Sequence, residues 1–368
     1  MKVGIDAKWF FRGNPSGKIV ITNLLKELIH NFPKDQFYVF LDKRDKVFEF
    51  PFKANNVKII YVWGRINLLS NVLIIPIVAR KYNIDVFMFQ YFPPFISNFK
   101  RIAFIHDVII KSNPEYFTLW ERLYFLPLKA LTKRAHAVCT VSQNERKRLI
   151  KLSYSDQKNI YVINNAVSDS FDSRANLNLN KINKVIEEYQ LPEKYLLYVG
   201  RLNQRKNIET LLKAINYLKN KEIKLICAGK IDWKMFDIKS KIIELGIKNR
   251  VILTGFIEDE KLPYLYSLST VFCYISLDEG FGLPPLEAMK SGVPTVVAKS
   301  GSLPEICGPA GSYVSPYDEI QVANVIDELL TNHQLYIQKQ ELGLLQAKKY
   351  SWEKSAKELH NVFTKLMQ

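Results

Sequence analysis

Two glutamates, Glu279 and Glu287, lie in the stretch DEGFGLPPLEAMKSG at positions 278–292. Two glycines between them remove the side chains that would keep a ligand away from the backbone. The prolines that follow predict the start of a helix, and Glu287 then falls in its first turn, where exposed N–H groups favour negative charge. Carboxylates accept hydrogen bonds, so this bend suits a hydroxyl-rich partner. A general acid and base pair is the competing interpretation.

A second stretch, YLLYVGRLNQRKNIETLLKAI at 195–215, reads as a buried strand, a turn with Arg201, Arg205 and Lys206, and a helix capped by Asn207. Ligands of open α/β sheets bind at the carboxyl ends of strands, and helix N-termini with nearby cations hold phosphates. A solvated basic turn is the alternative. Because the acidic bend also follows a strand, the two stretches together describe a site for a sugar nucleotide.

The first half of the chain offers two weaker candidates. His106 and Asp107 follow the apolar strand RIAFI, although a lone histidine is as often structural as catalytic. The stretch RGNPSGKI suggests a P-loop, but Arg12 stands where that motif needs glycine, and Ile19 where it needs Ser or Thr. What remains is a loop in which Gly17 allows a close approach to a ligand, or a plain turn.

Short apolar runs alternate with amphipathic helical patterns along the whole chain, which predicts an α/β protein with parallel sheets. One helix shows a core face at Ile21, Leu24, Leu25 and Leu28. The predicted strands are 2–6, 36–41, 57–61, 86–89, 101–106, 137–141, 160–163, 195–199, 224–228, 251–254, 270–275, 295–298 and 312–314.

Length and composition indicate two domains. The chain has 368 residues, of which 48% are hydrophobic, enough for two packed cores. The polar, aperiodic residues 168–183 form the expected linker. We therefore expect one domain over 1–172 and another over 185–351, followed by a last amphipathic helix within 352–368.

The net charge of +16 is concentrated in the first half, where residues 1–174 hold 27 Lys and Arg against 14 Asp and Glu. Such a surface attracts polyanions, either nucleic acid or an anionic membrane leaflet, unless it is only a solvated surface. The segment from Leu119 to Ala135 sets Trp120, Tyr124 and Phe125 beside lysines and arginines, as an interfacial helix does. The alternative is a helix packed on its sheet.

The four cysteines form no CxxC pair or zinc spacing, so we expect buried thiols, no disulfide and no structural metal. No signal peptide and no run of about 20 apolar residues is visible. These features favour a cytoplasmic protein. The motifs gather around a small ligand, which argues against a nucleic-acid partner.

These motifs carry a family resemblance. EGFGLPPLEAM resembles the Glu-x7-Glu signature of the retaining glycosyltransferases of family four, and YVGRLNQRKNIETLLKA resembles their phosphate-binding strand, turn and helix. GIDAKWF, FIHDVI, TVSQNERKRLI, ILTGFIEDEKLPYLYSLS and GSLPEICGPAG follow the family's order. The resemblance covers nearly the whole chain and implies the GT-B fold, in which two Rossmann-like doubly wound domains face a central cleft. It also implies that the final helix crosses back onto the acceptor-binding first domain.

The resemblance implies a role for each candidate residue. Arg201 and Lys206 would bind the donor diphosphate, Glu287 the ribose, and Glu279 the donor sugar. His106 would lie over that sugar, with Asp107 beside it towards the acceptor. Further donor contacts would come from Gly280, Phe281, Gly282, Leu283 and Gly17. The chain departs from the family at Ile19, where a second glycine is common, and this puts the Gly17 contact in doubt.

The expected activity is metal-independent, cofactor-free transfer of a hexose, with mannose from GDP-mannose as the leading candidate, to a lipid-linked or surface glycan with retention of configuration. UDP-hexoses are the alternative donors. A sensor that binds nucleotide sugars without catalysis is the alternative function. A phosphorylase of the same fold would need a pyridoxal phosphate lysine and usually a much longer chain.

Overall fold

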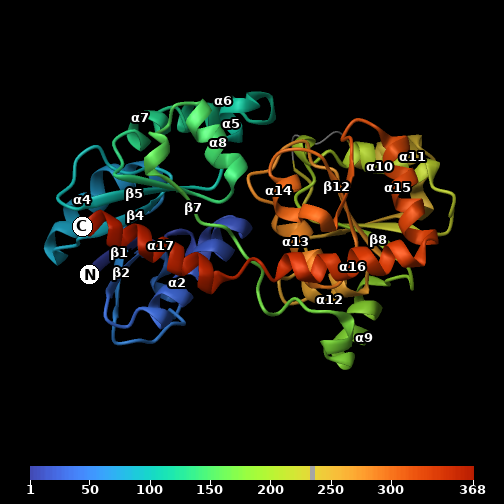
Figure 1. The fold of residues 1–368 in the computed structure, drawn as a ribbon, viewed down its shortest axis with the longest axis horizontal. Helices are drawn as coiled ribbons and strands as arrows, with labels where there is room; N and C mark the ends of the chain where they lie inside the picture. Colours follow the sequence, from blue (N-terminus) through green and yellow to red (C-terminus); the bar gives the residue numbers. More distant parts are fainter. Residues whose placement is uncertain (233–236) are drawn as a thin grey trace. The chain divides into compact units, whose positions relative to one another are not determined.

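The structure is a computed structural model that describes residues 1–232 and 237–368. The chain forms two compact units, the first comprising Met1–Asn165 with Ser351–Gln368 and the second Ala166–Tyr350. Each unit is built on one parallel β-sheet covered by helices (Figure 1). The predicted α/β class with two doubly wound domains is therefore confirmed.

The first unit has a seven-stranded sheet in the order β3-β2-β1-β4-β5-β6-β7. The strand order reverses between β1 and β4, the position at which open α/β sheets usually bind their ligands. The strands are β1 (Lys2–Asp6), β2 (Gln36–Asp42), β3 (Val57–Val62), β4 (Val86–Gln90), β5 (Lys100–Ile105), β6 (Ala137–Thr140) and β7 (Ile160–Val162).

The second unit has a six-stranded sheet in the order β10-β9-β8-β11-β12-β13, and its order reverses between β8 and β11. Its strands are β8 (Tyr195–Val199), β9 (Lys224–Ala228), β10 (Val251–Gly255), β11 (Val271–Tyr274), β12 (Thr295–Ala298) and β13 (Gly311–Val314). All thirteen strands predicted from apolar runs are present, with ends shifted by at most one residue.

Helices follow most strands. The longest cover the sheets with one apolar face: α2 buries Ile21, Leu24, Leu25 and Leu28, as its periodicity predicted. Helix α17 packs against α2 within the first unit (Figure 1). The main helices are α2 (Pro15–Asn31), α8 (Gln143–Lys151), α10 (Ile208–Tyr217), α11 (Ile238–Glu244), α12 (Leu262–Leu268), α13 (Leu283–Lys290), α15 (Glu319–Thr331), α16 (His333–Ala347) and α17 (Trp352–Met367).

Two segments differ from the prediction because side-chain caps start helices early. The supposed loop RGNPSGKI holds the end of α1 (Trp9–Arg12) and the start of α2, since Asn14 accepts a hydrogen bond from the Gly17 N–H at 2.6 Å. In the supposed linker, the Asn178 side chain accepts from Lys181 N and starts α9 (Leu179–Tyr189).

The segment Leu119–Ala135, interpreted as an interfacial helix or as a helix packed on its sheet, does not form one continuous helix. It forms α6 (Leu119–Tyr124) and α7 (Leu128–Thr132), with Pro127 between them. Tyr124 and Phe125 pack against a hydrophobic core cluster, whereas Trp120 is 82% exposed. Within the described residues, no helix combines the length and the apolar character that crossing a membrane requires.

Candidate active site

Two loops meet at the point of the second sheet where the strand order reverses. One follows β8 and contains Arg205 and Lys206; the other follows β11 and contains Glu279. Leu277 N donates to the Arg205 carbonyl at 2.9 Å, and the Arg205 guanidinium donates to the Asp278 carbonyl. The backbone thus ties the predicted cationic turn to the predicted acidic bend.

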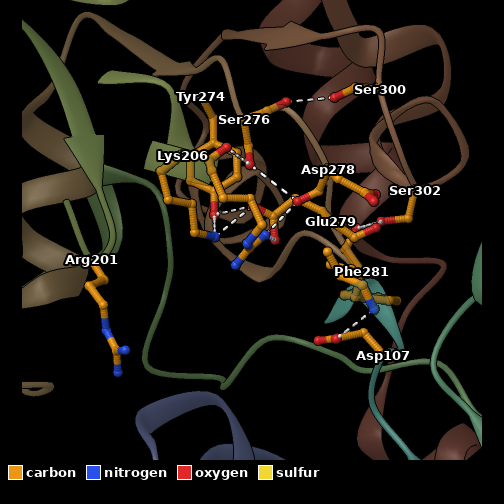
Figure 2. A network of polar contacts seen from close by, with 12 residues as sticks. Asp107, Arg201, Lys206, Tyr274, Ser276, Asp278, Glu279, Phe281, Ser300 and Ser302 are labelled. Atoms are coloured by element: carbon orange, nitrogen blue, oxygen red, sulfur yellow. Dashed lines mark hydrogen bonds and ion pairs between the residues drawn. The ribbon is translucent and has the colours of Figure 1, made fainter. Parts of the chain in front are cut away.

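The Glu279 carboxylate lies at the centre of a polar cluster (Figure 2). Lys206 Nζ is 2.6 Å from Oε1, the Tyr274 hydroxyl donates to Oε1 at 3.0 Å, and Arg205 lies 3.1 Å from Oε2. Lys206 also donates to the Tyr274 hydroxyl. We call Glu279, Arg205, Lys206 and Tyr274 the Glu279 cluster.

The cluster keeps Glu279 ionised. Burial by itself would raise the pKa of Glu279, but the neighbouring charges of Arg205 and Lys206 outweigh burial and lower its pKa to about 2. An ionised carboxylate accepts hydrogen bonds and has no proton to donate. The low pKa of Glu279 therefore favours a role as acceptor of hydrogen bonds from hydroxyl groups over a role as general acid.

The backbone around Glu279 is fixed by a neighbouring loop. Ser302 donates to the Glu279 carbonyl from its backbone N–H at 3.2 Å and from its hydroxyl at 3.0 Å. A side chain at Gly301 would place its Cβ 2.6 Å from Glu279 N. Gly282, with φ of +120°, turns the chain into α13. The predicted contact residues of this bend are all buried: Gly280, Phe281, Gly282 and Leu283.

Arg201 does not join the Glu279 cluster. Its side chain is 59% exposed, lies 3.7 Å from Asp232, and stands apart from Lys206 in Figure 2. Asn207 precedes α10 as predicted but is left-handed, with φ of 52°, and its side chain donates to the Pro316 carbonyl instead of capping the helix. Of the two predicted phosphate ligands, the structure therefore brings Lys206, and not Arg201, to Glu279.

Glu287 lies one turn later in α13 than expected, because the helix begins at Leu283 and its first turn holds no acidic residue. Its Oε2 accepts a hydrogen bond from the Tyr266 hydroxyl at 2.8 Å. Burial raises the pKa of Glu287 to about 7, against the opposing effect of that hydrogen bond. The two glutamates of one motif thus have opposite electrostatic environments.

In the first unit, His106 follows β5 and lies among the rings of Trp9, Tyr91 and Phe104, at centroid distances of 5.6, 5.7 and 5.1 Å. Its Nε2 is 2.8 Å from Gln90 Oε1. Burial lowers the pKa of His106 to about 4, so the ring is neutral at pH 7. Because the partner is a carbonyl oxygen, the neutral ring carries its proton on Nε2.

The other two predicted site residues of the first unit are Asp107, which follows His106, and Gly17, which packs against Trp9. Asp107 is half-buried, and its Oδ1 accepts from Ile109 N at 3.2 Å. Gly17 is buried in the first turn of α2, where a Cβ would lie 2.5 Å from Trp9 Cε3. Packing against the Trp9 indole is sufficient reason for glycine at this position.

Arg205 was predicted only as one cation of the basic, phosphate-binding turn, and no site role was predicted for Tyr274, Tyr266 and Gln90. Arg205 was visible, because it stands beside Lys206 in the same basic turn. Tyr274 and Gln90 end buried strands and read as core residues, so only the strand order shows that they reach a site. Tyr266 lies in the stretch ILTGFIEDEKLPYLYSLS, which carried the family resemblance but predicted no role for this residue. Among the residues that the structure describes, no group of three His, Cys, Asp or Glu side chains could hold a metal ion.

Comparison with known proteins agrees with this geometry. Residues 19–171 match the family model Glycosyltransferase Family 4, and residues 181–363 match Glycosyl transferases group 1. The O-antigen chain mannosyltransferase B of Escherichia coli is 32% identical over 271 residues, which are 72% of this chain and 70% of that protein. The serotype-specific mannosyltransferase WbdA of Escherichia coli is 30% identical over 277 residues, 73% of this chain but only 34% of the relative.

Solved structures share the whole fold. Sucrose-phosphate synthase from Thermosynechococcus elongatus aligns with a TM-score of 0.80 at 20% identity, covering 100% of this chain and 99% of the other. Anabaena Alr3699/HepE, solved with UDP and glucose, aligns with a TM-score of 0.75 at 18% identity, covering 99% and 100%. The fold is GT-B. The chain belongs to family four of the glycosyltransferases.

Proposed function

We propose that the protein transfers mannose from GDP-mannose to a growing surface glycan on a lipid carrier. The observation that carries this proposal is the Glu279 cluster at the carboxyl ends of β8 and β11. In it, an ionised carboxylate that can accept hydrogen bonds from hydroxyl groups lies beside two cations, Arg205 and Lys206. A sugar diphosphate needs both kinds of group in one place. The mannosyltransferase relatives support mannose as the sugar.

In this proposal the second unit, with a core domain of residues 185–351, binds the donor. Lys206 and Arg201 bind the diphosphate, and Glu279 accepts hydrogen bonds from the sugar hydroxyls. Glu287 binds the ribose. Arg201 is exposed enough to turn towards a ligand, because its contact with Asp232 is long and solvated. Backbone contacts come from Gly280, Phe281, Gly282 and Leu283.

The first unit, with residues 1–172 as its proposed domain, binds the acceptor. His106 lies over the donor sugar as a neutral hydrogen-bonding group, and Asp107 lies towards the acceptor. The new glycosidic bond forms on the same face as the departing phosphate, which takes the proton of the acceptor hydroxyl, so configuration is retained. This route assigns no proton transfer to Glu279, in keeping with its low pKa. It requires no metal ion and no cofactor.

The donor is tested by a thermal-shift panel of GDP, UDP, ADP and dTDP sugars, because a ligand that binds only the native state raises the melting temperature. We expect the largest rise with GDP-mannose. The structure of HepE with UDP and glucose makes a UDP-hexose the alternative. If none of the sugar nucleotides raises the melting temperature, the proposal is contradicted. If one binds but no sugar is transferred, the sensor function is favoured.

We also propose that the enzyme works at the cytoplasmic face of an anionic membrane. Three segments of the first unit expose large apolar side chains. Contacts between neighbouring residues connect these segments: the Phe92 ring lies 5.2 Å from the Tyr124 ring, and Tyr124 contacts the Leu68 backbone. We call the exposed side chains the apolar surface: Leu69, Leu73, Ile77, Phe95, Ile96, Leu119, Trp120, Leu123 and Leu126. Exposed Lys129 and Lys133 in and after α7 add the charge that anionic headgroups attract.

Flotation with liposomes of phosphatidylcholine alone or mixed with phosphatidylglycerol tests this location. We expect recovery with the anionic liposomes only, and a loss of recovery for Trp120→Ala with Leu123→Ala. The control is Tyr217→Ala, which removes an exposed aromatic residue of the second unit. Equal recovery on both lipids would exclude anionic docking.

A further inference from the structure

A pocket of about 480 Å³ lies in the first unit at the carboxyl ends of β1, β2 and β3. Its most informative lining residues are Lys8, Trp9, Arg12, Arg44, Arg65 and Tyr124. Four of these side chains carry positive charge and two are aromatic, and the lining also includes one acidic residue, Asp42. A pocket of this size has room for a sugar unit with a substituent.

The pocket has a rigid floor. Lys8 is buried and bonded to the Asp6 carboxylate and, at 2.6 Å, to Asn71 Oδ1. Gly64 closes over this floor, and a Cβ there would lie 2.6 Å from Asp42 Oδ2 and 2.7 Å from the Lys8 side chain. Glycine at position 64 therefore lets the chain lie directly against the Asp42 and Lys8 side chains.

The rim has an excess of one positive charge. Arg12 is bonded to Asp45 at 2.6 Å, and Arg44 to Asp42 at 2.7 Å, so each of these cations is balanced. Arg65 is exposed and has no ion-pair partner within the described part of the chain. Arginine binds carboxylates and phosphates with two parallel hydrogen bonds, so the rim can hold one anionic group.

The remaining walls suit a sugar. Trp9 and Tyr124 line the pocket with half-buried aromatic rings, a kind of surface on which the C–H groups of a pyranose can pack. Asn67 also lines the pocket, and its side-chain oxygen is buried without a hydrogen-bond partner among the described residues. This oxygen is an unused acceptor for a hydroxyl group.

The pocket borders both the candidate catalytic residue and the apolar surface of the same unit. The Trp9 ring that lines it also packs on His106, and Asp6 below it accepts from Gln90 N, whose side chain contacts His106. Tyr124 belongs to α6, whose other side chains, Trp120 and Leu123, are exposed.

We infer that this pocket binds an acceptor sugar through an adjacent anionic group, either a phosphate or a carboxylate, and that Arg65 is the residue that selects for the charge. The inference rests on the proposed function, because it specifies the acceptor of that transferase. A phosphate would come from the lipid carrier, and a carboxylate from an acidic sugar of the glycan.

The test uses fluorine NMR of the full chain labelled with 5-fluorotryptophan. The chain has five tryptophans, and Trp9 is assigned by the signal that Trp9→Phe removes. Methyl α-mannoside, mannose 1-phosphate and methyl glucuronoside are titrated separately. We expect the Trp9 signal to shift with at least one anionic probe at about tenfold lower concentration than with the neutral probe.

Arg65→Gln is expected to abolish this preference, whereas Arg80→Gln, which removes another exposed arginine of the same unit, is expected to keep it. A response to phosphate only assigns the lipid carrier, and a response to carboxylate only assigns an acidic sugar. Equal affinities for neutral and anionic probes, no Trp9 response, or equal losses in both variants would overturn the inference.

The same labelled protein separates this inference from the donor proposal. A nucleotide sugar that binds without any Trp9 response to the acceptor probes leaves the proposed function standing and rejects the anionic pocket. A Trp9 response to the acceptor probes in a protein that binds no nucleotide sugar supports the anionic pocket and rejects the proposed function.

Discussion

The two sheets share a doubly wound strand order, but the residues near their reversal points, Glu279 and His106, differ in charge. In the second sheet, Glu279 is charged and held by Arg205 and Lys206. In the first, His106 is neutral, bonded to the Gln90 amide and enclosed by aromatic rings. Both positions lie near the point where the strand order reverses.

The difference shows that a doubly wound sheet supplies a place for a ligand, while the side chains at strand ends decide its chemistry. A charged edge suits a diphosphate and its sugar. A neutral histidine ring such as that of His106 can lie close to a sugar without adding charge. In the proposed function, the edge of the second sheet binds the donor and the edge of the first sheet belongs to the unit that binds the acceptor.

The largest effect is expected from breaking the charged edge. Glu279→Gln keeps the shape of the side chain but removes the negative charge that Arg205 and Lys206 contact, so we expect transfer to fall by at least roughly a hundredfold. Glu188→Gln, which breaks a surface pair with Lys261, is the control and should keep full activity. Wild-type turnover in Glu279→Gln would show that the charge of Glu279 is not needed for transfer.

A smaller effect separates the two predicted phosphate ligands. Lys206→Ala should weaken binding of GDP or UDP by about 1.5–3 kcal/mol, the usual contribution of a hydrogen bond to a charged group. Arg201→Ala should cost less, because the Arg201 side chain is largely exposed and must be ordered on binding. Calorimetric titration measures both, and a larger loss in Arg201→Ala would reverse the assignment.

A third prediction concerns stability within the acidic motif. Burial raises the pKa of Glu287 to about 7, so between its unfolded value near 4.5 and pH 7 the folded state holds the proton more tightly. The free energy of unfolding should therefore fall as pH rises through this window, by on the order of 3 kcal/mol. Urea denaturation at pH 5 and pH 8 measures it.

The Glu287→Gln variant should lack this dependence and be more stable than the wild type at pH 8. Glu279 provides the contrast, because its pKa is lowered to about 2 and its stabilising contribution is lost only as pH falls below about 4.5. An identical pH dependence in wild type and Glu287→Gln would show that Glu287 is not the buried acid described here.

The smallest effect of pH is expected at His106. With a pKa of about 4, His106 should not titrate between pH 5.5 and 8, so its ring signals in NMR should stay constant over that range. His333, on the surface of the second unit, provides an exposed reference in the same sample. A midpoint near 6.5 for His106 would show that its pocket is solvated.

Much of this organisation could be read from the sequence, for physical reasons. Buried parallel strands are continuous apolar runs, so their positions were visible. Proline placed the start of α13, and the glycine-rich bend marked the acidic loop. Helix starts set by Asn14 and Asn178 were missed, because asparagine is common both in loops and at N-caps.

The composition of the site was less predictable than its position. The sequence shows three cations in one turn, but which of them faces Glu279 depends on side-chain direction, which no spacing rule supplies. Tyr274 and Gln90 became visible as site residues only when the strand order placed their strand ends at the reversal points. Opposite pKa shifts for Glu279 and Glu287 depend on tertiary partners that no motif encodes.

The most direct test of the central claim is a crystal structure of the full chain with GDP-mannose or, if the thermal-shift panel selects it, a UDP-hexose. We expect Lys206 Nζ to lie within hydrogen-bonding distance of the diphosphate and Glu279 to accept hydrogen bonds from the sugar hydroxyls. A donor whose diphosphate and sugar both lie away from Glu279 and Lys206 would contradict it.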